Sequence, residues 1–273
     1  MVLDISHLHL HLGNAHILDD VSLSVAESER VGIIGVSGSG KSMIAKTVLG
    51  LTAHEARISG HLYSNGEDLL TWSDSRRASL RGTFMSAIFQ DPLRALNPVW
   101  TVRKNIELPL TIHYDLTASE RDERVREIIA HVDLSEDVLT RYPSQLSGGQ
   151  AQRVAIAQAL VASPRLLIAD EPTTALDSIT QAHVLHTLHD VTQRMNVAVL
   201  FISHDFSVIS RMTDRTYVID HGRIVESGDT HSIMNAPTHE YTRTLVEAAR
   251  QISLESATVG DAGGMDSTSE VNA

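Results

Sequence analysis

Hydrophobic and polar residues alternate near the start of the chain in the manner of short β-strands. The alternation is partial over residues 3–12 and clean over residues 21–25, and a period of two is typical of a half-buried strand. Residues 31–34 form an uninterrupted apolar run that ends at Gly35. Such a run before a glycine-rich loop indicates a buried parallel strand that turns into a helix.

Strand and helix patterns alternate along most of the remaining chain. We expect helices over residues 41–50, 76–80, 119–131, 147–161 and 178–195, and strands over residues 58–70, 85–89, 166–169, 197–202, 217–219 and 223–226. Ser119 is the expected N-cap of its helix because two acidic residues follow in the first turn. The alternation predicts an α/β fold with a mostly parallel sheet and helices on both faces.

Residues 91–162 depart from this alternation because their pattern is predominantly helical. We interpret them as an α-helical subdomain inserted into the α/β core. From Ser253 onward the chain is rich in Ser, Gly, Ala and acidic residues, which predicts a disordered acidic tail over residues 253–273. The folded part is then residues 1–252, with a C-terminal extension over about residues 230–252.

Composition limits the kinds of protein that the chain can be. Hydrophobic residues make up 42% of it, yet no stretch reaches the roughly 20 apolar residues that span a bilayer. The amino terminus lacks the charged and apolar regions of a secretion signal. The absence of cysteine excludes disulfides and thiolate metal sites, and the net charge of -12 argues against a nucleic-acid partner.

A phosphate-binding loop is predicted directly after the apolar run at residues 31–34. The P-loop pattern GxxxxGK[ST] is matched by Gly35-Val36-Ser37-Gly38-Ser39-Gly40-Lys41-Ser42. Its glycines let successive backbone N–H groups face a phosphate, Lys41 can reach the β- and γ-phosphates of ATP, and the Ser42 hydroxyl can bind Mg²⁺. We expect ATP to be bound by Gly35, Ser37, Gly38, Ser39, Gly40, Lys41 and Ser42.

Two acidic residues end the apolar run at residues 166–169, in the arrangement of a Walker B motif. We expect their strand to neighbour the P-loop strand, which would place Asp170 beside the Mg²⁺. Glu171 would then face the γ-phosphate and accept a proton from the attacking water.

The run Leu146-Ser147-Gly148-Gly149-Gln150 lies between these two motifs. It resembles, without a mismatch, the LSGGQ signature of the ATP-binding-cassette (ABC) ATPases, and Ser147 is expected to start a helix whose open N–H groups can face an anion. The resemblance extends over about residues 3–245. It implies a RecA-like P-loop NTPase core with an N-terminal antiparallel β subdomain and an inserted α-helical subdomain.

Further family elements follow in the expected order. Gln90 stands at the Q-loop position, where family members contact the metal and the nucleophilic water, and Ala175-Leu176-Asp177 resembles the D-loop. His204 resembles the switch histidine that holds the γ-phosphate. The resemblance implies an ATPase whose catalytic residues are Lys41, Gln90, Glu171 and His204 and whose Mg²⁺ ligands are Ser42, Gln90 and Asp170.

Family membership also implies that two nucleotide domains pair head to tail. ATP would lie between the P-loop of one domain and the signature of the other. The partner's site would therefore be completed by Ser147, Gly148, Gly149 and Gln150. Closure and reopening of this dimer would drive transmembrane subunits between states.

One position departs from the family pattern. Members usually carry an aromatic residue ahead of the P-loop that stacks on adenine, and that position here falls on Leu12. Stacking of a base on an aromatic ring contributes about 1–3 kcal/mol, so we expect weaker ATP affinity or base selectivity. His11 is expected to project to the opposite face of the strand.

A branch of the family is indicated by residues 90–98, QDPLRALNP, which resemble the FQDPxxSLNP segment of ATPases that serve oligopeptide, dipeptide and nickel importers. Residues 239–242, HEYT, resemble the HPYT of their C-terminal extension. This resemblance implies two transmembrane permease subunits, a second ATPase subunit that is a related chain or a second copy, and an extracytoplasmic solute-binding protein. The chain would be a peripheral subunit at the cytoplasmic face of the cell membrane.

Alternatives from other classes are less consistent with the sequence. ABC ATPases that act on ribosomes usually carry two nucleotide domains, and those that act in DNA repair carry long coiled-coil insertions. An exporter ATPase is disfavoured by the segment at residues 90–98, and a regulatory subunit without turnover by the intact Glu171 and His204.

The 15 histidines raise the question of a metal site. His7, His9 and His11 alternate along an expected strand, and three more recur along the expected helix at residues 183, 186 and 189. Histidine triads can bind zinc, but we expect no local acidic second shell to support a site in either set. We expect solvated polar stripes.

Overall fold

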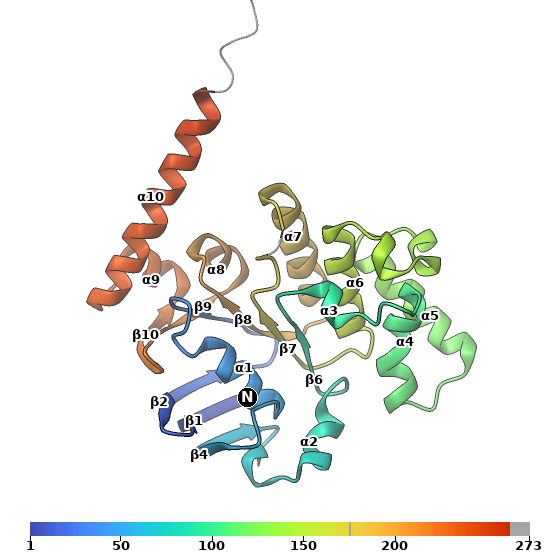
Figure 1. Cartoon of the computed structure of the whole chain (residues 1–273), viewed down its shortest axis with the longest axis horizontal. Coiled ribbons are helices and arrows are strands. Elements are labelled where there is room, and N and C mark those ends of the chain that lie inside the picture. Colours follow the sequence, from blue (N-terminus) through green and yellow to red (C-terminus); the bar gives the residue numbers. More distant parts are fainter. Residues whose placement is uncertain (175, 263–273) are drawn as a thin grey trace, which may run out of the picture.

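A computed structural model gives the fold for residues 1–174 and 176–262, with side chains described up to residue 251. Two β-sheets lie at one end of the molecule and a group of helices lies at the other (Figure 1). This division matches the expected α/β core with an N-terminal β subdomain and a helical insertion.

The amino-terminal strands form an antiparallel sheet in the order β2-β1-β4-β5. They are β1 (Leu3–Leu12), β2 (Ala15–Val25), β4 (Ala56–Ser64) and β5 (Glu67–Asp68). Leu10 pairs with Leu18 across β1 and β2, and both are buried. His11 pairs with His16, and because neighbouring side chains alternate along a strand, these histidines lie on the outer face of the sheet.

A second sheet has the strand order β10-β9-β3-β8-β7-β6. Its parallel strands are β3 (Arg30–Ile34), β6 (Met85–Ile88), β7 (Leu166–Asp170), β8 (Ala198–Ser203) and β9 (Arg215–Asp220), and β10 (Arg223–Asp229) is antiparallel to β9. The prediction of a mostly parallel sheet is confirmed. The prediction that the strand of Asp170 neighbours the P-loop strand is wrong, because the chain returns from β7 to place β8 between β7 and β3.

Both faces of the parallel sheet are buried, which explains its uninterrupted apolar runs. In β7, Leu166 and Ile168 pack in the same cluster as the N-terminal sheet and α1 (Lys41–Leu49), whereas Leu167 and Ala169 pack with the helical side. All four are fully buried. Successive side chains of a strand point to opposite faces, so a strand covered on both sides needs apolar residues at every position.

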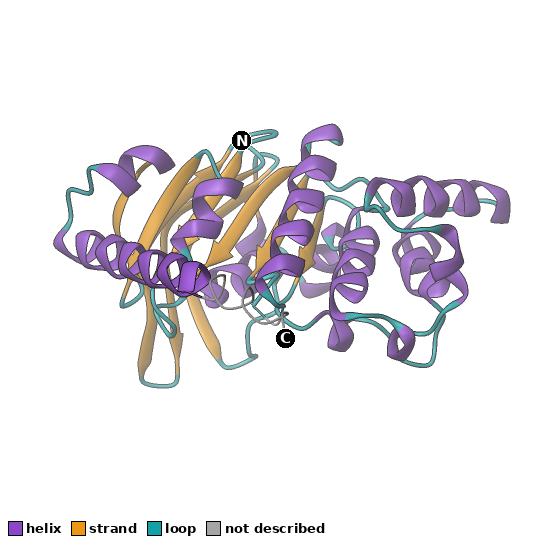
Figure 2. Cartoon of the chain, turned by 90° about the horizontal axis from the view of Figure 1, so that it is seen from above, coloured by secondary structure: helices purple, strands orange, loops and turns teal. Residues whose placement is uncertain are grey.

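The helical lobe is clear of the strands when the molecule is seen from above (Figure 2). It consists of α3 (Pro92–Ala95), α4 (Val102–His113), α5 (Ala118–His131), α6 (Gly148–Leu160) and the 3-10 turns Glu136–Thr140 and Pro143–Gln145. These elements lie within the predicted subdomain of residues 91–162, whose boundaries remain a prediction.

The start of α5 differs from the sequence prediction. Thr117, and not Ser119, is the N-cap: its hydroxyl accepts a hydrogen bond from the Glu120 N–H at 3.3 Å, and the Glu120 carboxylate accepts one from the Thr117 N–H at 2.7 Å. This reciprocal capping box satisfies two otherwise unpaired N–H groups. The helix therefore begins at Ala118.

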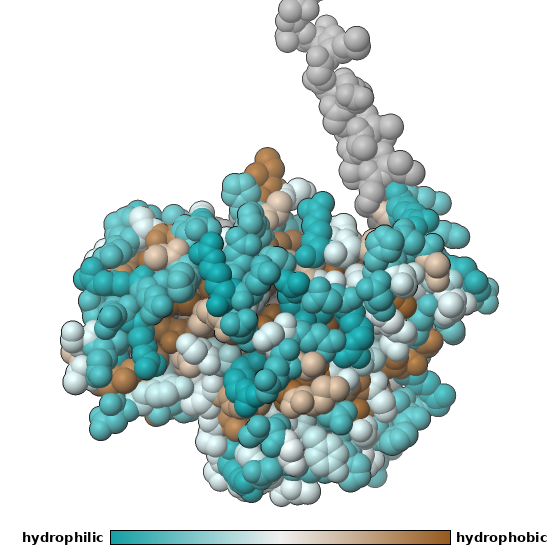
Figure 3. All heavy atoms as spheres, turned by 180° about the vertical axis from the view of Figure 1, so that it is seen from behind, coloured by the Kyte–Doolittle hydropathy of each residue, from teal (hydrophilic) through white to brown (hydrophobic). Residues whose placement is uncertain are grey.

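The remaining helices lie outside the helical lobe. They are α2 (Asp74–Leu80), α7 (Ser178–Arg194), α8 (Phe206–Met212), α9 (Thr230–Asn235) and α10 (Glu240–Ala262), with a 3-10 turn at Leu69–Thr71. None of the helices in the described part of the chain combines the length and hydrophobicity that a bilayer crossing requires. The face opposite to the view of Figure 1 is mostly hydrophilic, with hydrophobic residues in small separate groups (Figure 3).

Helix α10 projects away from the body of the molecule (Figure 1). Its bounds, Glu240–Ala262, carry it into residues 253–273, the segment predicted as a disordered tail. A low apolar content predicts little burial, but it does not stop a helix that has already begun. Residues 263–273 lie outside the described residues.

Candidate functional site

A cavity of about 350 Å³ lies where the P-loop meets the carboxyl end of β7. It is lined by Ile17, Ser37, Gly38, Gly40, Lys41, Ser42, Met43, Gln90, Asp170 and Glu171. Residues from four separate parts of the sequence thus meet at one place. Most of the predicted site residues are among them.

Gly35 and Ser39 shape the P-loop without lining the cavity. A Cβ atom at Gly35 would lie 2.2 Å from the Ile219 carbonyl oxygen, so only glycine fits. Ser39 is buried, and its carbonyl accepts a hydrogen bond from the Gly222 N–H at 2.9 Å. The turn between β9 and β10 therefore packs against the P-loop and stabilises its conformation.

Lys41 is the first residue of α1, and only 5% of it is exposed. Its Nζ donates hydrogen bonds to the carbonyls of Gly35 and Val36, both at 2.9 Å. Burial lowers the pKa of Lys41, while the carboxylates of Glu171 and Asp170 oppose this effect. An ammonium group has three N–H donors, so the loop holds it over the cavity with one donor still available for a phosphate.

Asp170 and Ser42 bring two oxygen atoms together in the cavity. The Ser42 hydroxyl donates to Oδ1 of Asp170 at 3.0 Å, and Asp170 is 8% exposed. Burial raises the pKa of Asp170, as does Glu171, whereas the Ser42 hydrogen bond and the charge of Lys41 lower it. A buried carboxylate whose hydrogen-bond donor is a neutral hydroxyl is a favourable place for a cation.

The chemistry of these groups fits Mg²⁺. Carboxylate, hydroxyl and amide oxygens are the ligands that hard cations prefer, and Gln90 lines the same cavity. Neighbouring ligands around Mg²⁺ lie about 2.9 Å apart when the bonds are about 2.0–2.1 Å long, which is close to the 3.0 Å between Ser42 Oγ and Asp170 Oδ1.

Glu171 follows Asp170 in a left-handed backbone conformation, with φ of 50°. Such a conformation costs a non-glycine residue about 1–3 kcal/mol and is often retained at functional sites. The Glu171 N–H donates to the Ile202 carbonyl at 2.9 Å, which ties the residue to β8. The backbone thus turns the Glu171 side chain into the cavity.

His204 orients the carboxylate of Glu171. Nδ1 of His204 lies 3.1 Å from Oε1 of Glu171, and the Thr174 hydroxyl donates to Oε2 at 3.1 Å. The His204 side chain is 49% exposed and borders a separate cavity beside α7 and α8. The predicted γ-phosphate contact of His204 remains a prediction.

The signature residues do not line the cavity that contains Lys41. Ser147 caps α6: its hydroxyl accepts from the Gln150 N–H at 3.3 Å, and the Gln150 side chain accepts from the Ser147 N–H at 3.1 Å. Ser147 and Gly148 are exposed, whereas Gly149 is buried against Thr180. The N-terminus of α6 is therefore not part of the lining of this chain's own P-loop cavity.

The predicted D-loop is described in part, because Ala175 lies outside the described residues. Leu176 approaches Gly148, where an added Cβ would lie 3.2 Å from its Cδ2 atom. Asp177 caps α7 and accepts a hydrogen bond from the Thr180 N–H at 3.0 Å. The D-loop and the signature are thus neighbours.

Three residues near the cavity were not predicted from the sequence. Ile17 and Met43 line it, but nothing in the sequence distinguishes them from core residues. The Tyr241 hydroxyl accepts a hydrogen bond from the Val36 N–H at 3.2 Å, and the only sequence signal was the HEYT resemblance. Leu12 packs against the N-terminal core and does not line the cavity.

Comparisons with known proteins place these features in a family. The family model described as ABC transporter matches residues 18–174. The dipeptide transport ATP-binding protein DppD of Escherichia coli is 39% identical over 254 residues, which is 90% of this chain and 78% of that protein. The metal-staphylopine import system ATP-binding protein CntD of Staphylococcus aureus is 36% identical over 86% of this chain and 88% of its own length.

Solved structures show the same relationship. A dimeric bacterial ABC transporter cassette is 30% identical, with a TM-score of 0.74 over 84% of this chain and 98% of that chain. The protein cbiO1 of Clostridium perfringens, part of the ABC transporter complex cbiONQ, has a TM-score of 0.77 at 22% identity over 97% of this chain and 99% of its own, which supports the fold. The cavity, the fold and these matches together establish that the chain belongs to the ABC transporter family, as an ATP-binding subunit that hydrolyses ATP.

Proposed function

We propose that this chain energises an importer for peptides, or for nickel and related small solutes, from the cytoplasmic face of the cell membrane. The single observation that carries the proposal is the cavity that gathers the P-loop, Gln90, Asp170 and Glu171, in a chain 39% identical to a dipeptide transport ATP-binding protein. The similarity to a metal-staphylopine import protein keeps small metal-containing solutes within the proposal.

The partners follow from this role. Two transmembrane permease subunits would form the pathway, a second ATPase subunit would complete the dimer, and an extracytoplasmic solute-binding protein would deliver the solute. The segment after Gln90 supports contact with a permease because it exposes apolar side chains, with Leu93 48% and Val99 75% exposed. Apolar residues exposed beside a functional site are typical of an interaction surface.

In this proposal ATP binds with its phosphates in the cavity. The P-loop backbone and the N-terminus of α1 attract the phosphate charge, and Lys41 directs its remaining N–H donor toward the β- and γ-phosphates. Ser42, Asp170 and Gln90 would hold Mg²⁺, which neutralises charge on the β- and γ-oxygens. Ile17 and Met43 supply apolar contact at the rim.

Hydrolysis requires a water molecule in line with the bond between the γ-phosphorus and the β–γ bridging oxygen. Glu171 accepts the proton of this water while the oxygen attacks phosphorus and ADP leaves. The hydrogen bonds of Glu171 to Thr174 and the contact with His204 fix the carboxylate for this step. Gln90, on the same cavity wall, would position the water together with Glu171.

The site is proposed to be completed in trans. Ser147, Gly148, Gly149 and Gln150 lie outside the lining of the P-loop cavity in their own chain, which supports their use by a partner. A capped helix N-terminus with an exposed Ser147 and Gly148 suits an incoming γ-phosphate. A single chain should therefore hydrolyse ATP slowly.

The transport role is tested by purification of the tagged chain from solubilised native membranes, followed by mass spectrometry. Recovery of two permease subunits, an ATPase subunit and a solute-binding protein is the expected result. Recovery of ribosomal or DNA-repair proteins without a permease would contradict the importer and leave only the ATPase activity.

The site assignments are tested separately with purified protein. Glu171→Gln should bind ATP, lose turnover and accumulate as a dimer, while Lys41→Ala should lose ATP binding. Ser147→Arg should retain ATP binding through its own P-loop but fail to support hydrolysis. Loss of ATP binding in Ser147→Arg would contradict the head-to-tail arrangement, and wild-type turnover in Glu171→Gln would contradict its role as base.

A further inference from the structure

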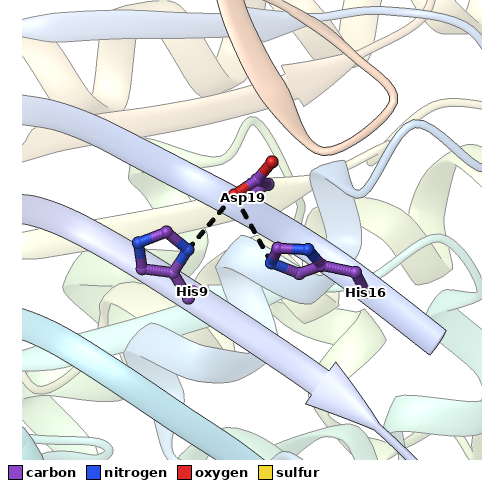
Figure 4. Close-up of side chains that lie close together, drawn as sticks. All are labelled: His9, His16 and Asp19. Atoms are coloured by element: carbon purple, nitrogen blue, oxygen red, sulfur yellow. Dashed lines mark ion pairs between the residues drawn. The ribbon is translucent and has the colours of Figure 1, made fainter. Parts of the chain in front are cut away.

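Three side chains of types that can bind a metal ion meet on the outer face of the N-terminal sheet. His9 comes from β1, and His16 and Asp19 come from β2 (Figure 4). One ligand atom from each lies within 4.8 Å of the other two. Nδ1 of His9 is 3.2 Å and Nε2 of His16 is 3.5 Å from the same oxygen, Oδ1 of Asp19.

We propose that His9, His16 and Asp19 form a binding site for a divalent transition-metal ion of the zinc type, distinct from the Mg²⁺ site in the nucleotide cavity. In a tetrahedral zinc site with bonds of about 2.0–2.1 Å, neighbouring ligand atoms lie about 3.3–3.4 Å apart. The two contacts to Asp19 match this separation. Three protein ligands leave one position for water.

Asp19 is already held in a ligating orientation. Its other oxygen, Oδ2, contacts the Arg223 guanidinium on β10, while Oδ1 faces both histidines. A carboxylate ligand fixed by an outer hydrogen bond is typical of metal sites.

His11 lies beside the three proposed ligands. Its ring stacks on His16 with 4.0 Å between centroids and 12° between planes. Besides Oδ1 of Asp19, Nδ1 of His9 lies 3.3 Å from the Asp20 N–H, and a bound ion would replace this second contact.

The ligand set selects the class of ion. Imidazole nitrogen with a carboxylate suits zinc, nickel and copper, whereas Mg²⁺ prefers oxygen ligands alone. The chain contains no cysteine that could compete for a soft ion. Zinc is therefore the appropriate probe.

The site adjoins the nucleotide cavity through the backbone. Ile17, which lines the cavity, lies in β2 between two of the three ligands. The Asp19 N–H donates to the Gly222 carbonyl at 2.9 Å, and the Gly222 N–H donates to the Ser39 carbonyl of the P-loop at 2.9 Å. A bound ion would link β2, the strand that carries Ile17, to β1 and so restrict the movement of β2 relative to β1.

The test is a titration of the full-length, nucleotide-free chain with Zn²⁺ against a chromophoric chelator, in buffer without Mg²⁺. We expect one high-affinity zinc per chain. Loss of an outer hydrogen-bonding partner of a metal ligand weakens metal binding by about 10–100-fold. His9→Ala and His16→Ala each remove a ligand and should weaken zinc binding by at least as much. Asp19→Asn removes the charge with little change of shape and should also weaken it.

Two matched controls separate this site from other binding. His61→Ala removes a histidine that pairs with Asp68 at 2.8 Å on the same sheet but has no second histidine in its pair, so zinc affinity should not change. Asp170→Asn alters the nucleotide cavity and should also leave it unchanged. Circular dichroism of each variant establishes that it is folded.

The identity of the ligands has an independent readout. Co²⁺ in place of Zn²⁺ should give the intense visible absorption of a four-coordinate ion in the wild-type chain and in His61→Ala, and lose it in Asp19→Asn. The proposal is overturned if His9→Ala and His16→Ala bind zinc like the wild type, because zinc would then be bound adventitiously by surface histidines. It is also overturned if only Asp170→Asn loses zinc binding.

Discussion

The signature helix offers a sharp test of the packing beneath it, at Gly149. A Cβ atom placed there would lie 2.5 Å from Cγ2 of Thr180 in α7, whereas carbon atoms pack favourably at about 3.5–4.0 Å. Gly149→Ala therefore requires a displacement of about 1 Å between the start of α6 and the start of α7. Both atoms are close to the backbone, so neither can simply swing away.

The size of the effect can be worked from these contacts. Overpacking of this kind costs about 1–3 kcal/mol, and the better helix propensity of alanine offsets up to about 1 kcal/mol. We expect Gly149→Ala to reduce the free energy of unfolding by about 1–2 kcal/mol. Thr180→Ser deletes the Cγ2 atom but keeps the hydroxyl and the backbone N–H that donates a hydrogen bond to Asp177. The double variant should therefore regain the free energy of unfolding that Gly149→Ala loses.

The assay is a double-mutant cycle by urea unfolding of the wild type, Gly149→Ala, Thr180→Ser and the double variant. A favourable coupling energy of about 1–2 kcal/mol is expected between the two substitutions. Additivity within about 0.3–0.5 kcal/mol, the agreement typical of independent sites, would refute the clash as the cause. The ATPase rates of the same four proteins should rank in the same order.

Three further predictions concern the nucleotide site and the C-terminal extension. Leu12→Tyr should introduce base stacking and strengthen ATP binding by up to about 1–3 kcal/mol, or about 5–150-fold, in a fluorescence titration. Leu12→Val serves as the control and should bind ATP like the wild type. Equal ATP affinities of the two variants would place the adenine elsewhere. Tyr241→Phe removes the acceptor for the Val36 N–H and should raise the KM for ATP up to about tenfold without a change in melting temperature. A lower melting temperature with an unchanged KM would show that Tyr241 has only a structural role. Partial burial raises the pKa of Glu226, but hydrogen bonds including those from Thr238 and His239 lower it to about 2 from the usual 4.5. The stabilisation that Glu226 contributes is thus complete above about pH 4.5 and is lost as the pH falls toward 2. The free energy of unfolding, measured with urea, should therefore fall by about 1–2 kcal/mol on account of Glu226 between about pH 5 and pH 2. Glu226→Gln should reduce that fall.

The sequence by itself determined the motifs whose residues are contiguous. The P-loop, the Walker B acids and the signature are short runs, and each was identifiable because its chemistry depends on neighbours in the chain. Residues 31–34 and 166–169 were recognised as buried strands from their unbroken apolar runs, and β3 and β7 confirm them. Capping also acts locally, yet the sequence placed the start of α5 at Ser119 because Thr117 and Ser119 are both good caps, and only the hydrogen bonds to Glu120 selected the first.

The tertiary structure decided what depends on contacts between distant segments. The order of the strands places β8 between β3 and β7 and so brings together segments that are far apart in the sequence. The contact of Tyr241 with the P-loop joins residues 205 positions apart, and no local pattern can encode it. The three alternating histidines show the same limit.

His7 lies at a bulge with φ of 50° and pairs with Asp20 at 2.7 Å, while His9 meets His16 and Asp19 across the sheet. Spacing along β1 suggested a shared face for all three histidines and no acidic partner. Strand register brought the carboxylate to His9, because a bulge changes which side chains face one another and its position is fixed by packing of the whole sheet.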